Sequence, residues 1–151
     1  MAGLTARSGE RRGVIGFLTA PALYFVGLTA LCSAYIQGPV TKLADFDSAV
    51  AEMTHFGLTP APLIAALVIL FELSMSFLVL SGSYRWAGAA ALAGFTLFAT
   101  FIALRFWEVP PGVERTMSTN GFFEHLGLAG AFGLVAWNDL QRRCTTMTDK
   151  S

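Results

Sequence analysis

Four long stretches with almost no charge constrain the fold of this chain more than any other feature. They are residues 14–36, 62–80, 86–104 and 121–137. The only charged residues within them are Glu72 and Glu124. A helix on the surface of a soluble protein has a polar stripe, whereas these stretches are apolar all round. Each reaches, or nearly reaches, the roughly 20 residues that cross a bilayer core of about 30 Å. The pattern predicts four transmembrane helices.

The composition points to the same class of protein. Of the 151 residues, 54% are hydrophobic and 13% are charged, whereas an average soluble domain is about 25% charged. Such a composition excludes intrinsic disorder. Ten basic residues are balanced by ten acidic ones, which excludes a nucleic-acid-binding protein that relies on a basic surface. Four buried helices of a soluble bundle would leave almost no polar surface to keep the protein in solution.

The expected fold class is all-α, an integral membrane four-helix bundle formed by residues 14–137 between tails at 1–13 and 138–151. Seven of the ten basic residues lie in these tails or in the short loop at 81–85. The positive-inside rule then places both termini in the cytoplasm, which agrees with an even number of crossings. The first stretch is longer than the 7–15 apolar residues of a signal peptide, so we expect a retained helix.

The connections carry further predictions. The longest, residues 37–60, has apolar residues three and four positions apart, namely Leu43, Phe46, Val50 and Met53. This spacing predicts an interfacial helix in the external connection between the first two membrane helices. Residues 38–43 are interpreted as a turn that precedes it, and residues 105–120 as a polar loop. Pro21 predicts a kink in the first membrane helix.

The cysteines and histidines predict neither a disulfide nor a metal site. Cys32 should lie near the outer end of the first helix and Cys144 in the cytoplasmic tail, which is too far for a disulfide. The chain has no CxxC motif, and His55 and His125 have no partner at metal-ligand spacing.

Glu72 is the strongest candidate for a functional residue. A carboxylate near the bilayer centre costs at least about 2.5–3.5 kcal/mol unless it is neutral or paired, and such residues usually face a cavity or a functional site. Its expected neighbours are Ser33, Thr96, Thr100 and His125. Two interpretations remain open: a proton-exchanging group beside a pocket, or a structural carboxyl that hydrogen-bonds between helices.

Four more residues are candidate ligand contacts, namely Lys42, Arg105, Glu124 and His125. Lys42 either extends to lipid headgroups or turns inward toward acidic groups or an anionic ligand. His125 titrates near neutral pH and could exchange protons, which makes it a candidate catalytic residue beside Glu72. The helix dipole alone would explain Glu124 near a helix start. Arg105 is either an interfacial anchor or a ligand contact.

Several short motifs follow one another along the chain. They are Gly38 with Lys42-Leu43, Phe46, Gly57-Leu58 with Pro60, Phe71-Glu72-Leu73, Arg85 and an acidic start to the fourth helix. In this order they resemble the DoxX family of four-helix bacterial membrane proteins, over about residues 14–137. The family pattern covers Gly38, Lys42, Glu72 and Glu124, and it supplies no established catalytic residue.

The resemblance implies a small bacterial inner-membrane protein that associates with redox partners. DoxD-like relatives are subunits of a thiosulfate:quinone oxidoreductase, and mycobacterial DoxX joins a superoxide dismutase and a sulfurtransferase in an oxidative-stress complex. One interpretation is therefore a membrane subunit of an oxidoreductase complex, with a quinone as ligand and no covalently bound cofactor. The other is a non-catalytic module that scaffolds partners or transports a small solute, alone in the lipid or as a homo-oligomer. Whether the chain itself is an enzyme stays open at this point.

Overall fold

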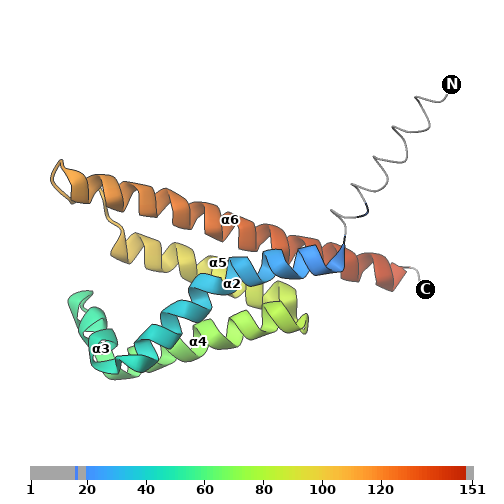
Figure 1. The fold of residues 1–151 in the computed structure, drawn as a ribbon, viewed down its shortest axis with the longest axis horizontal. Coiled ribbons are helices and arrows are strands. Elements are labelled where there is room, and N and C mark those ends of the chain that lie inside the picture. The colour runs from blue at the N-terminus through green and yellow to red at the C-terminus, as the bar shows by residue number, and fades with distance from the viewer. Residues whose placement is uncertain (1–15, 17–19, 149–151) are drawn as a thin grey trace.

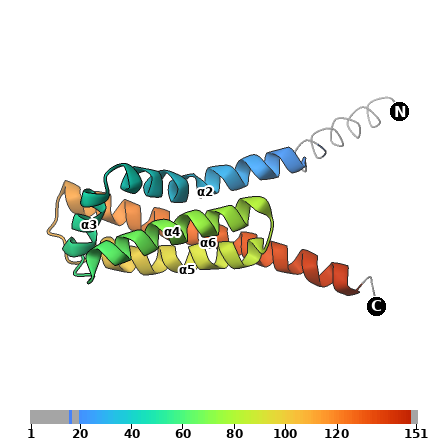
Figure 2. The same ribbon diagram turned by 90° about the horizontal axis from the view of Figure 1, so that it is seen from below.

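The structure is a computed structural model that describes residue 16 and residues 20–148, and all of its described elements are helices (Figure 1). They are α2 (Pro21–Ala44), α3 (Phe46–His55), α4 (Ala61–Ser81), α5 (Arg85–Ala103) and α6 (Val113–Thr148). The four long helices form a bundle, and the short α3 crosses one end of it (Figures 1 and 2). The predicted tail at 1–13 and the predicted helix start at residue 14 lie outside the described residues.

Helices α4 and α5 form the hairpin that the apolar stretches 62–80 and 86–104 predict. Helix α4 starts directly after Pro60 and has Pro62 in its first turn, where a missing N–H costs nothing. It ends at Gly82, whose φ of 82° is the left-handed conformation typical of a helix C-terminus. The small residues of α5 allow close packing at Gly88, where a Cβ atom would lie 2.8 Å from the carbonyl oxygen of Met75.

Helix α2 differs from the prediction at both ends. Helix α2 begins at Pro21, and most of the predicted helix before it, with the predicted kink, lies outside the described residues. The helix then runs through Gly38 and Pro39 to Ala44, so the turn predicted at 38–43 is wrong. A proline inside a helix removes one hydrogen bond, but the neighbouring helices of a membrane bundle compensate for the loss. Pro39 is fully buried, and α2 changes direction part-way along its length (Figure 1).

Helix α3 confirms that the connection at 37–60 contains a helix. Asp45 caps it by accepting a hydrogen bond of 3.0 Å from the backbone N–H of Ser48. Met53 and Ala49 are buried against the start of α4, with Val50 packed beside them. Leu43 belongs to α2 and is exposed, so the predicted apolar stripe is correct only in its second half.

Helix α6 is longer than predicted. The apolar stretch 121–137 is its centre, but the helix begins at Val113 and continues to Thr148. The second half of the predicted loop at 105–120 and most of the predicted tail at 138–151 are therefore helical. Lys150 lies outside the described residues. Helix α6 packs along α5 and extends past the α4–α5 hairpin (Figure 2).

Three helices, α2, α4 and α5, are long and apolar enough to cross a membrane. Their outward faces carry large apolar side chains such as Phe25, Leu70 and Phe101, each more than half exposed, as expected of helices that contact lipid. Helix α6 is not apolar enough to be counted with these three helices. That α6 crosses the membrane therefore stays a prediction. The core between the four long helices contains Leu28, Cys32, Tyr35, Val79, Ala89, Leu92, Phe132 and Ala136.

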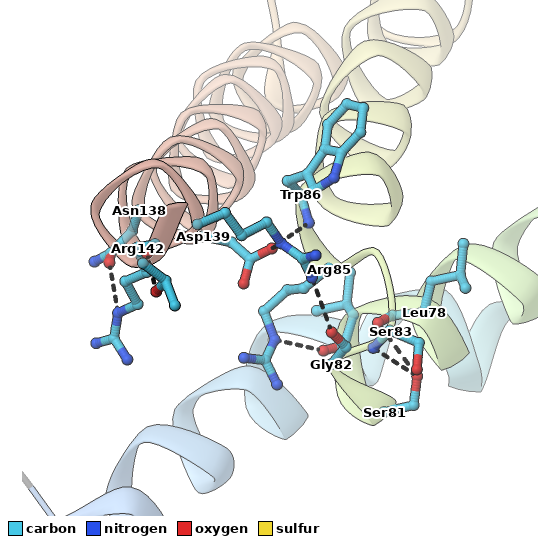
Figure 3. Close-up of polar contacts among 12 residues, drawn as sticks. Leu78, Ser81, Gly82, Ser83, Arg85, Trp86, Asn138, Asp139 and Arg142 are labelled. Atoms are coloured by element: carbon cyan, nitrogen blue, oxygen red, sulfur yellow. Dashed lines mark hydrogen bonds and ion pairs between the residues drawn. The ribbon is translucent and has the colours of Figure 1, made fainter. Parts of the chain in front are cut away.

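Polar contacts tie the hairpin to α6 (Figure 3). The carboxylate of Asp139 accepts a hydrogen bond of 3.3 Å from the backbone N–H of Trp86 and one of 2.8 Å from Arg143. Arg143 also donates to the carbonyl oxygen of Gly82 at 3.4 Å. Within the hairpin, Arg85 donates to the carbonyl oxygen of Val79 at 2.8 Å. We call this region the hairpin end of the bundle.

Candidate functional site: a cavity with polar groups between the helices

A cavity of about 540 Å³ lies between all five described helices, at the end of the bundle opposite the hairpin. Most of its wall is apolar. The apolar lining residues include Met53, Phe56, Leu58, Ile64, Val68, Phe95, Phe98, Ile102, Leu104 and Leu128. Seven polar side chains also face it: Tyr35, Lys42, Glu52, Glu72, Thr96, Thr100 and His125. A few polar groups in an apolar wall are typical of a small-molecule site.

Glu72 lies on α4 in the inner part of this cavity, which agrees with a carboxyl beside a pocket. It is eleven residues from the start of α4, about 17 Å along the helix at 1.5 Å per residue. Its Oε2 atom is buried and has no hydrogen-bond partner among the described residues. Buried polar atoms are nearly always paired, so an unpaired one that lines a cavity indicates a place for a ligand or a water.

Lys42 forms an ion pair with Glu52 of α3, with 3.1 Å between Nζ and the carboxylate oxygen. Its side chain is only 22% exposed, so Lys42 takes the inward of its two predicted orientations. The continuation of α2 through Pro39 is what brings Lys42 over the cavity. Both charged side chains line the same cavity as Glu72. The pair joins the end of α2 to α3.

A chain of hydroxyl groups forms another part of the wall. The Tyr35 hydroxyl is hydrogen-bonded to Thr96, and Thr96 in turn donates to the carbonyl oxygen of Leu92 at 2.6 Å. Thr100 donates to the carbonyl oxygen of Thr96 at 2.6 Å. Thr96 and Thr100, both predicted neighbours of Glu72, therefore line the same cavity. The prediction for Ser33 is wrong: it is exposed and donates to Ala30 within its own helix.

The remaining predicted residues divide into two groups. His125 lines the cavity, and its Nδ1 lies 2.7 Å from the carbonyl oxygen of Gly121. If Nδ1 carries the proton, Nε2 is left as an acceptor. Glu124 is exposed and does not line the cavity. Arg105 also lies outside it, in an exposed pair with Glu108 at 3.1 Å.

Two contributors to the site were missed at the level of sequence. Glu52 lies on the polar side of α3, and only the crossing of α3 over the bundle places it beside Lys42. Tyr35 lies near the predicted outer end of the first membrane helix, where aromatic residues are usually interfacial, but it is 6% exposed and packs edge-on against Phe132. Tyr35 could have been identified from the sequence, because its hydroxyl is a polar group on a helix that is otherwise apolar.

A bundle of apolar helices around a cavity with charged and hydroxyl groups defines a helical membrane protein with an internal cavity. The chain belongs to the DoxX family, because the family model described as DoxX matches residues 29–105, slightly more than half of its length. The match includes Lys42, Glu52 and Glu72, whereas His125 and the rest of α6 lie outside it. No curated protein and no solved structure matches the chain.

Proposed function

We propose that this protein is the membrane subunit of a redox complex and that it binds a quinone in the cavity beside Glu72. The unpaired buried oxygen of Glu72, facing a cavity of ligand size, is the observation that carries the proposal. Ligand pockets usually have volumes of about 300–1,000 Å³. A quinone has an apolar ring and tail with two carbonyl oxygens, which matches an apolar wall with a few hydrogen-bonding groups.

The polar residues supply the chemistry that a bound quinone needs. Reduction of a quinone to a quinol takes two electrons and two protons, and it forms an O–H bond at each carbonyl oxygen. In this proposal a partner protein that oxidises a thiol or another sulfur compound supplies the electrons. The protonated carboxyl of Glu72 hydrogen-bonds to one quinone oxygen and donates a proton to it. In this proposal His125, protonated at both ring nitrogens, donates the second proton from Nε2 to the other quinone oxygen.

The proposed location is a bacterial inner membrane with both termini in the cytoplasm, and the two thiols test this orientation. Cys32 is buried and Cys144 is exposed, and both are free. A membrane-impermeant maleimide should label Cys144 in inside-out vesicles and leave it unlabelled in intact spheroplasts. Cys32 should stay unlabelled in both until the protein is denatured. Labelling of Cys144 in spheroplasts, measured by mass spectrometry, would contradict the orientation.

Quinone binding is tested on protein purified in mild detergent. We expect about one quinone per chain in the solvent extract. Val68→Trp, which fills the cavity, should lower the bound quinone by at least about tenfold, equivalent to about 1.4 kcal/mol. Leu67→Trp is the matched control, because Leu67 precedes Val68 on α4 but is 54% exposed and does not line the cavity.

The result also separates the two functional classes. Equal loss of quinone in both tryptophan variants, or none in either, would contradict binding in this cavity. Wild-type protein that purifies as a homo-oligomer without quinone, and that takes up none when a short-chain quinone is added, would favour a scaffold or a solute-transport module.

A further inference from the structure

The hairpin end carries a cluster of arginines that the proposed function does not use. Arg85 at the start of α5 and Arg142 on α6 both lie over the ring of Tyr24 on α2, with their guanidinium carbons 5.5 Å and 5.8 Å from the ring centre. Three helices thus contribute to one cationic surface. Figure 3 shows how close the hairpin and α6 come at this end.

Among the described residues, nothing near this surface fully balances its positive charge. Asp139 is the single acidic residue in the described segments that meet here, 21–31, 76–91 and 133–148. Its carboxylate is paired with Arg143. In the described part of the chain, Arg85 hydrogen-bonds to a backbone carbonyl and Arg142 to the side-chain amide oxygen of Asn138 at 3.1 Å. Two guanidinium groups therefore share one aromatic ring without a carboxylate partner.

The position of this surface indicates the kind of anion that would bind it. Helix α4 is long enough, at about 31 Å, to cross the hydrocarbon core, so its end at Ser81 lies at the level of the lipid headgroups. Tyr24 is 39% exposed and Arg142 is exposed, so an anion can reach both from the membrane surface. Guanidinium groups bind phosphate through two parallel hydrogen bonds, and basic pockets between membrane helices bind anionic headgroups.

We propose that Arg85, Arg142 and Tyr24 form a binding site for the phosphate of an anionic phospholipid such as phosphatidylglycerol. The phosphate accepts hydrogen bonds from both guanidinium groups and lowers the repulsion between them. The Tyr24 ring holds the two side chains in place. This site is at the opposite end of the bundle from the cavity and is independent of the quinone proposal.

Native mass spectrometry of the purified protein with equal amounts of phosphatidylglycerol and phosphatidylcholine tests the site. Wild-type protein should retain phosphatidylglycerol preferentially. Each arginine near a membrane surface contributes roughly fivefold to the binding of an anionic lipid, so the double variant R85Q/R142Q should lower phosphatidylglycerol occupancy roughly 30-fold. Arg115→Gln is the matched control, because it removes the same charge near the opposite end of α6.

A folding defect is separated from a loss of binding by the single variant Arg142→Gln. Arg142 makes no contact that holds the hairpin, so this variant should elute like wild type and lose phosphatidylglycerol roughly fivefold. Equal retention of the two lipids by wild type, or an unchanged preference in R142Q, would overturn the proposal. If millimolar inorganic phosphate displaces the lipid, the arginines do bind phosphate. The assignment of the site to a lipid would then be overturned.

Discussion

Replacing Glu72 by leucine is expected to weaken quinone binding by about ten- to a hundredfold while leaving the bundle folded. Leucine leaves one carbonyl oxygen of the bound quinone buried without a hydrogen bond, which costs about 1–3 kcal/mol. The unpaired Oε2 atom costs about 1–3 kcal/mol of desolvation in the unliganded protein. The leucine variant should therefore be as stable in detergent as the wild type, or more stable. Titration with a short-chain quinone and thermal unfolding measure the two effects.

Glu72→Gln tests the proton transfer separately from binding. Glutamine keeps the shape of the side chain and can donate a hydrogen bond through its amide, but it has no acidic proton. We expect quinone binding within a few-fold of wild type and loss of quinone reduction in membranes that contain the partner. Glu124→Gln is the control, since Glu124 lies outside the cavity. A fully active E72Q protein at matched expression would show that Glu72 does not transfer the proton. Quinone binding by E72L as tight as that of wild type would show that Glu72 does not contact the quinone.

Gly88→Ala is expected to have the largest effect on stability. The added Cβ atom would lie 2.8 Å from the carbonyl oxygen of Met75 and 2.9 Å from the Cβ atom of Leu78. Both neighbours are close to the α4 backbone and cannot rotate away. Overpacking of this kind costs about 1–3 kcal/mol. The midpoint of unfolding in a series of denaturing detergent mixtures should fall accordingly, and a valine at the same position should prevent the hairpin from packing.

Gly94→Ala provides the comparison within the same helix. A Cβ atom at Gly94 meets no other atom within 4 Å. Alanine is a better helix former than glycine by about 1 kcal/mol, so this variant should be neutral or stabilising. Equal destabilisation by both substitutions would show that the close contact at Gly88 does not limit the approach of α4 and α5.

The membrane helices could be predicted because charge is excluded from hydrocarbon whatever the tertiary structure. For that reason residues 62–80 and 86–104 agree with α4 and α5 to within one residue at each end. The end of α2 was missed because Gly38-Pro39 ends most helices in water, whereas a packed bundle tolerates it. The start of α6 was missed because a polar segment such as 113–120 has the composition of a loop as much as that of a helix end.

The site could be predicted only where a single residue was unusual in its own segment. Glu72 is conspicuous because it is an acid in the middle of an apolar helix. Glu52 is one of two acids on the short amphipathic helix α3, and nothing in its local sequence distinguishes it from Asp47. Its role depends on how α3 crosses the bundle, which is a property of the tertiary structure. Arg105, like Lys42, is a basic residue near the end of an apolar helix. The fold nevertheless places Arg105 outside the cavity.

The length of α6 has a mechanical consequence. At 1.5 Å per residue its 36 residues extend about 54 Å, while a bilayer core is about 30 Å thick. His125 in the cavity wall and Arg142 at the hairpin end lie on this one helix, about 26 Å apart along its axis. A continuous helix resists compression because its backbone hydrogen bonds run parallel to that axis. A sliding movement of α6 along its axis would therefore displace the cavity wall at His125 and the hairpin end at Arg142 by the same amount and in the same direction.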